Sequence, residues 1–110
     1  MEISFKDEKI QKVCNIKKEA IKKYGPETAK KLRQRLENLR AASNLEMMLS
    51  LPGRCHELKG ERKKQLSLDL KHPLRLIFEA MGENLVKVDG GLNWSLIKAI
   101  RILGIEDTHE

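Results

Sequence analysis

The chain has 110 residues, enough for one hydrophobic core but not for two, so we predict a single domain over residues 1–110. It carries 22 basic and 16 acidic side chains, and it has no run of about 18 apolar residues, so we expect no membrane-spanning segment. Cys14 and Cys55 are far apart and no secretory leader pattern is present, which favours a cytoplasmic protein without a structural zinc site.

The start of the chain predicts one strand and two helices. Apolar residues alternate with polar ones over residues 1–5, the period of a strand with one buried face. Apolar residues then recur at helical spacing over 10–24, with Asp7 as a cap. Gly25 ends this helix and a proline begins the next, which we expect over 26–43. The two helices should form an antiparallel hairpin packed on a sheet.

The middle of the chain predicts a short helical turn followed by a three-stranded meander. Residues 44–51 should place leucine and methionine side chains in the core. Leucines at every second position, with Phe78 ending the second run, predict strands over 66–70 and 74–78. An earlier strand over 54–59 should pair with them through the cationic turn 60–64.

The last third predicts one further long strand. Residues 85–88 can continue a strand before the turn at 89–91. Residues 97–105 are apolar at odd and even positions, which predicts a strand buried on both sides. The predicted fold class is therefore α+β, with an N-terminal strand and an antiparallel helix hairpin packed on a mainly antiparallel sheet.

The charge is distributed unevenly along the chain. Residues 1–43 carry a net +6 and residues 54–75 a net +4, whereas residues 76–110 carry −3. A basic chain suits a polyanionic partner such as RNA, although lysines on helices often form only a solvated face. The block 54–75 is more informative because its cations stand among histidines in a predicted sheet.

Some residues point to chemistry on a phosphate, whereas nucleotide-binding loops and serine or cysteine triads are not indicated. Attack of a ribose 2′-hydroxyl on the neighbouring phosphate needs a base, an acid and cations for the developing charge. Histidine can serve either proton role near neutral pH, and Arg and Lys bind phosphate oxygens. The candidates are His56, Lys59, Arg62, Lys63, Arg75 and His109.

Structural interpretations of these residues stand beside the functional one. Arg75 can simply pair with Asp69 on the neighbouring strand, and His109 can be solvated near the end of the chain. His56 and Lys59 are three residues apart, so a straight strand sends them to opposite faces unless it ends early. From the residues alone, a plain basic nucleic-acid-binding domain remains an alternative.

Several segments together resemble the signature of HigB-type killer toxins, the plasmid maintenance killer proteins of the RelE/ParE superfamily of type II toxin–antitoxin systems. They are RCHELKG at 54–60, RK at 62–63, SLDL at 67–70 and RLIF at 75–78. The ending IEDTH at 105–109 resembles the closing strand of the family with its acidic-x-His terminus. The order of elements also agrees, so the resemblance covers nearly the whole chain.

The resemblance implies a small cytoplasmic toxin that binds the ribosome and cleaves mRNA as an endoribonuclease, without a metal or cofactor. It implies a helix hairpin on one face of a twisted sheet and an active cleft on the other. It also implies neutralisation by a helix-turn-helix antitoxin similar to HigA, contact with operator DNA only through the antitoxin complex, and no membrane. The basic residues of 1–43 would then meet ribosomal RNA.

The resemblance further implies roles for individual residues. His56 and His109 would share proton transfer, while Lys59 and Arg75 would stabilise the charge that develops on the phosphate. The implied RNA contacts are Arg54, Arg62, Lys63, Lys64 and Thr108.

One position departs from the family pattern. Many relatives have tyrosine before the final histidine, where a ring can stack on a base, but this chain has Thr108. Base orientation would then come from elsewhere, with Trp94 as a candidate. The alternative functions are a non-nucleolytic ParE-like toxin that acts on a protein such as DNA gyrase, and a basic RNA-binding module.

Overall fold

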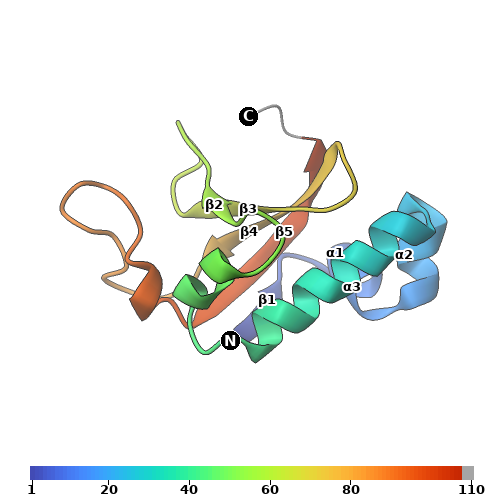
Figure 1. Ribbon diagram of the computed structural model, residues 1–110, viewed down its shortest axis with the longest axis horizontal. Coiled ribbons are helices and arrows are strands. Elements are labelled where there is room, and N and C mark those ends of the chain that lie inside the picture. The colour runs from blue at the N-terminus through green and yellow to red at the C-terminus, as the bar shows by residue number, and fades with distance from the viewer. Residues whose placement is uncertain (108–110) are drawn as a thin grey trace.

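Five strands form one sheet, and the helices cover one of its faces (Figure 1). A computed structural model of the chain describes residues 1–107. The strands are β1 Glu2–Phe5, β2 His56–Glu57, β3 Gln65–Asp69, β4 Leu74–Ala80 and β5 Ala99–Asp107. The helices are α1 Glu8–Asn15, α2 Lys17–Tyr24 and α3 Pro26–Ala41, with short 3-10 helices η1 Leu45–Ser50 and η2 Trp94–Leu96.

The sheet has the strand order β1-β5-β4-β3-β2. The first pair is parallel, and the others are antiparallel. The predicted α+β class and the mainly antiparallel sheet are therefore confirmed.

The predicted first helix is in fact two helices that meet at Ile16. Its φ of −118° and ψ of 108° are extended values that break the helix. The break lets α1 contact β1 and β5 while α2 packs beside α3. Asp7 caps α1 as predicted, since its side chain accepts a hydrogen bond of 3.0 Å from the N–H of Ile10. None of the helices within residues 1–107 is long and apolar enough to cross a lipid bilayer.

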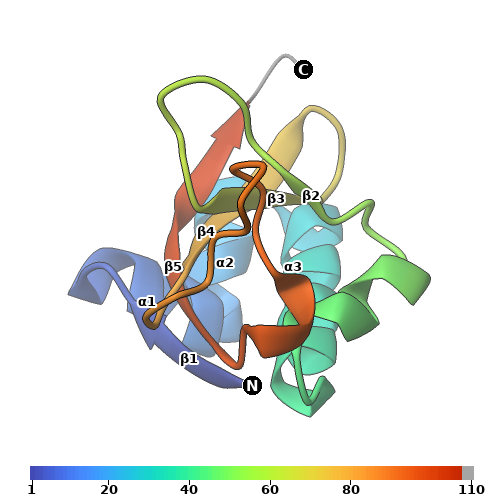
Figure 2. The ribbon, with the colours of Figure 1, turned by 90° about the vertical axis from the view of Figure 1, so that its left-hand side faces the viewer.

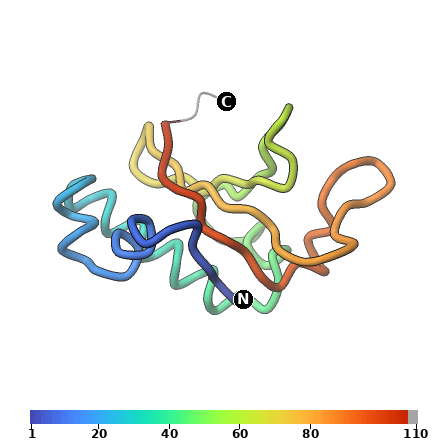
Figure 3. Tube along the Cα trace, turned by 180° about the vertical axis from the view of Figure 1, so that it is seen from behind, coloured from blue at the N-terminus to red at the C-terminus, as the bar shows by residue number. Residues whose placement is uncertain are grey.

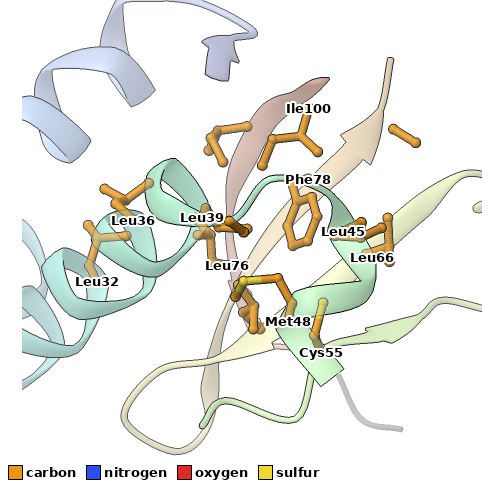
Figure 4. Packing of buried hydrophobic residues seen from close by; sticks show 14 of the residues in the cluster. Leu32, Leu36, Leu39, Leu45, Met48, Cys55, Leu66, Leu76, Phe78 and Ile100 are labelled. Atoms are coloured by element: carbon orange, nitrogen blue, oxygen red, sulfur yellow. The ribbon is translucent and has the colours of Figure 1, made fainter. Parts of the chain in front are cut away.

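The core lies between α3 and the sheet (Figure 4). Leu32, Leu36 and Leu39 recur on one face of α3, and none is more than 1% exposed. They pack with the sheet residues Leu76 and Phe78, both 0% exposed. Full burial of such side chains contributes about 1.5–3 kcal/mol each.

The short segment η1 closes one end of this core. Asn44 caps it, and Leu45 and Met48 are completely buried. Met47, by contrast, is 46% exposed. The prediction that this segment fills the core is therefore confirmed for Met48 and wrong for Met47.

The meander follows the predicted alternation, but its first strand is shorter than expected. Leu66 and Leu68 face the helices, which places Ser67 and Asp69 on the other side. The strand predicted over 54–59 shrinks to β2, because Gly53 and Arg54 have φ values of +115° and +51° that prevent extended pairing.

Two predictions for the last third need correction. The segment 85–88 is not a strand, since its only pairing in the described chain is an isolated bridge between Val86 and Leu92. A strand is present where predicted, but it spans Ala99–Asp107 rather than 97–105, and only one of its faces is covered by helices. Ile100 and Ile102 are therefore buried, whereas Leu103, on the other face, stays partly exposed.

Candidate functional site

The face of the sheet that the helices leave uncovered carries the predicted site residues on two neighbouring rows. The rows are Asp69–Arg75–Glu106 and His56–Ser67–Ile77. The loop 58–64 and the end of β5 both rise on this side, away from α3 (Figures 1 and 3). The structure thus brings His56 and Arg75 to one face.

Asp69 is the centre of the first row. Its carboxylate pairs with the Nε atoms of Arg75 at 3.2 Å and Arg54 at 3.1 Å. Its backbone N–H donates to the Gly53 carbonyl at 2.7 Å, and its carbonyl accepts from Arg35 Nε at 2.8 Å. Asp69 is thus held through both its backbone and its side chain, and it orients two guanidinium groups.

The ion pair between Arg75 and Asp69 was expected as a structural alternative to catalysis, and it is present. The Arg75 side chain is only 13% exposed. Charge-assisted hydrogen bonds strengthen where water is excluded, so the guanidinium direction is well defined. The ion pair with Asp69 therefore also fixes the direction of the Arg75 guanidinium, the cation expected to stabilise charge on a phosphate.

His56 is oriented by a backbone carbonyl. Its Nδ1 lies 2.9 Å from the Arg54 oxygen, which can only accept, so Nδ1 carries the proton of the neutral ring. Ser67 Oγ lies 3.5 Å from the same nitrogen and is the weaker contact. In this tautomer Nε2 is the nitrogen that can accept a proton, as a general base requires.

The predicted cations of the loop 58–64 differ in their surroundings. Lys59, Lys63 and Lys64 are exposed. Arg62 instead makes a bidentate ion pair with Glu106, at 2.7 Å and 3.2 Å, and donates to Gln65 at 2.8 Å. Because β2 ends before Lys59, strand parity no longer sends this lysine to the face opposite His56.

Trp94 lies on the other face of the sheet. Its Nε1 donates to a Glu57 carboxylate oxygen at 2.9 Å, and the ring packs against the helix-side core. Glu57 is the register partner of the core residue Leu66, so it points away from the His56 face. The expectation that Trp94 supplies base stacking at the site is therefore wrong.

The site-bearing face has a small pocket beside Asp69 and Arg75 among the described residues. A pocket of about 70 Å³ beside Asp69 and Arg75 can hold water but not a nucleobase. Thr108 and His109 lie outside the described residues. The described chain ends at Asp107, the register partner of Leu74.

The cysteines are chemically quiet. Burial raises the pKa of the Cys55 thiol to about 12, and burial does the same for Cys14, where the Arg40 charge opposes it only in part. Both thiols are protonated near neutral pH, so neither is a nucleophile there. Within residues 1–107, no three His, Cys, Asp or Glu side chains gather as a metal site would require.

Asp69 and Glu106 are site residues that sequence reasoning did not select. Asp69 was noted only as a partner for Arg75, although strand alternation placed it on the required face. Glu106 stands in the tail motif but carried no assigned role. Glu106 pairs with Arg62, which is 44 residues away in the chain, so no local sequence pattern predicts this pair.

Comparison with known proteins gives the class of fold. No family model matches the sequence, and no curated protein matches it. Among solved structures, the YoeB/ParE toxin from Agrobacterium tumefaciens is similar, with a TM-score of 0.62 over 99% of this chain and 100% of that chain. The sequence identity is 10%, so the likeness establishes the RelE/ParE-type fold. Function must be argued from the residues of this chain.

Proposed function

We propose that this chain is the toxin of a type II toxin–antitoxin system and that it cleaves mRNA on the ribosome. The observation that carries the proposal is the placing of His56 and Arg75 on one helix-free face of a RelE/ParE-type sheet. His56 has its proton-accepting nitrogen defined by the Arg54 carbonyl, and Arg75 has its direction defined by Asp69. A base and an oriented cation are two of the groups that 2′-hydroxyl attack on a phosphate requires, and an acid for the leaving oxygen is the third.

The division of labour in this proposal is the one that the HigB resemblance implies. His56 and His109 share proton transfer, which is worth about 10²–10⁴-fold in rate. Arg75 and Lys59 stabilise the charge that develops on the phosphate, each contributing roughly 3–4 kcal/mol if preorganised. Arg54, Lys63 and Lys64 contact the RNA backbone, and Thr108, which lies outside the described residues, is proposed as a further RNA contact.

The proposal carries the partners that the HigB resemblance implies. A helix-turn-helix antitoxin similar to HigA neutralises the toxin, and operator DNA is bound only through that complex. The toxin acts in the cytoplasm on the ribosome and its mRNA. The exposed lysines of the helices supply a salt-dependent attraction to ribosomal RNA.

A second candidate function is a non-nucleolytic toxin that acts on DNA gyrase. The similar structure is named for ParE as well as YoeB, so the fold is shared by both branches. Toxicity that survives removal of both histidines favours this candidate. A third, a basic RNA-binding module, requires that expression without an antitoxin be harmless.

The decisive experiment is primer extension on an mRNA in a purified translation system, with and without ribosomes. Wild-type protein is compared with His56→Ala, Arg75→Ala and His109→Ala. Arg101→Ala is the matched control, because Arg101 is paired with Glu79 on the same sheet face but outside the two rows. We expect codon-phased breaks that need ribosomes and vanish in the three test variants only. No breaks from folded wild-type protein would overturn the nuclease and direct attention to a gyrase supercoiling assay.

A further inference from the structure

The loop 58–64 covers part of the site-bearing face. Ser67 and Ile77 are 0% exposed although they point away from the helices. Leu58, on the loop itself, is also buried at 6%, and neither it nor Ile77 belongs to the helix-side core. Buried side chains therefore also lie on the site-bearing face, outside the helix-side core, and the arch of the loop over the sheet is seen in Figure 2.

One side chain fastens this loop to two strands that are not neighbours. Arg62 Nε donates to Gln65 on β3 at 2.8 Å, while its Nη1 and Nη2 donate to both carboxylate oxygens of Glu106 on β5. Strand β4 lies between them, so the contact spans two strand spacings, or about 10 Å. A fork with both terminal nitrogens on one carboxylate is a directional bond.

We propose that Arg62 is a positioning residue and that its ion pair with Glu106 clamps the loop 58–64 beside the end of β5. The clamp fixes Lys59 relative to Arg75, the register partner of Glu106. It also fixes the strand end from which the chain continues to His109. This role rests on the proposed function, and it replaces direct RNA binding by Arg62, because a phosphate would have to displace Glu106 from a bidentate pair.

The two roles predict opposite effects for Glu106→Gln. If Arg62 binds RNA directly, removal of the neighbouring negative charge should free the arginine and speed cleavage. If Arg62 is a clamp, Glu106→Gln and Arg62→Gln should each lower the kcat of ribosome-dependent cleavage about 10- to 100-fold, the cost of misplaced catalytic groups. The double variant should then be no slower than the slower single variant, because both changes break one contact.

Arg101→Gln is the matched control. Arg101 pairs with Glu79 at 2.6 Å on the same face and is similarly exposed, but this pair joins adjacent strands and holds no loop. We expect its cleavage rate to remain within about 3-fold of wild type, as for a surface pair away from the chemistry.

Hydrogen exchange of the 58–64 segment tests the clamp without using activity. We expect faster exchange in Arg62→Gln and Glu106→Gln and wild-type exchange in Arg101→Gln. Unchanged loop protection in either clamp variant overturns the proposal, as does a released loop with undiminished cleavage, faster cleavage by Glu106→Gln, or losses that multiply in the double variant. If wild-type protein fails to cleave mRNA, the proposed function falls, and the exchange data still decide whether the clamp exists.

Discussion

Arg35 Nε donates a 2.8 Å hydrogen bond to the backbone carbonyl of Asp69, so a helix residue fixes the strand residue that orients the site. Arg35 lies on α3 and is only 8% exposed. Its guanidinium passes along Gly53, whose own carbonyl accepts the Asp69 N–H. The direction of Arg75 on one face of the sheet thus depends on packing against the other.

This relationship makes Gly53 sensitive to substitution. A Cβ at Gly53 would lie 2.7 Å from Arg35 Nε and 3.0 Å from Leu68 Cδ2, at a φ of +115°. Gly60 is the control, since its φ is +74° but nothing lies within 4 Å of its added Cβ. We expect Gly53→Ala to lower the free energy of unfolding by about 2–4 kcal/mol and Gly60→Ala by about 1 kcal/mol, measured by urea denaturation. Equal losses would show that Arg35 moves aside freely.

Asp69→Asn should separate site orientation from stability. The change keeps the size of the side chain but removes the charge that holds Arg54 and Arg75. We expect cleavage to fall about 10- to 100-fold through misorientation, while the free energy of unfolding drops by only about 1 kcal/mol. Asp89→Asn, which removes an exposed carboxylate beside Lys87, is the control. Wild-type cleavage by Asp69→Asn alongside an inactive Arg75→Ala would refute the orienting role.

Glu57 should matter for the loop before η2 and not for the chemistry. Its carboxylate accepts hydrogen bonds from Trp94 Nε1 and from the N–H of Leu92. Glu57→Ala should lower the free energy of unfolding by about 1–3 kcal/mol and shift the emission of the single tryptophan to the red. Cleavage should change less than about 3-fold, because Trp94 lies on the opposite face. Loss of cleavage together with the red shift would return Trp94 to the site.

The thiols of the buried Cys55 and the half-buried Cys14 should make stability fall at alkaline pH. Their pKa values are raised to about 12 in the folded protein, against about 8.5 in an unfolded chain. The unfolded state therefore loses protons first, so the stabilising contribution is complete below about pH 8.5 and is lost as pH rises towards 12. Within that window each thiol changes the free energy of unfolding by about 1.4 kcal/mol per pH unit.

Cys55→Val tests this pH dependence against wild type. The variant removes one titrating group while keeping an apolar side chain at a site that is 7% exposed. Urea denaturation at pH 8 and pH 10.5 should show a smaller loss of stability in the variant than in wild type. Parallel losses would mean that Cys55 does not titrate as its burial requires.

The sheet was predictable because its signal is local. Leucines at every second position define β3 and β4, and the same alternation places Asp69 and Arg75 on one face. The end of the first helix was harder, because Ile16 breaks it without glycine or proline. There the break is set by what α1 and α2 each pack against, which local sequence does not encode.

The candidate site was only half predictable for a related physical reason. His56 and Arg75 stand in strands, so their faces follow from register. Arg62 stands in a loop, and its partner Glu106 comes from a distant strand. Residue type suggested a phosphate contact for this arginine, whereas the tertiary fold supplies a carboxylate.

The pairing of β1 with β5 has a consequence for synthesis. Ser4 on β1 and Ile100 on β5 are 96 positions apart in the chain, so β1 cannot pair until β5 is present. Loop closure over such a distance delays assembly of the sheet. Until β5 has been synthesised and has left the ribosome, the chain lacks Glu106, the residue that completes the Arg75 row. The sheet and the site-bearing row are therefore completed only when β5 becomes available to pair with β1 and β4.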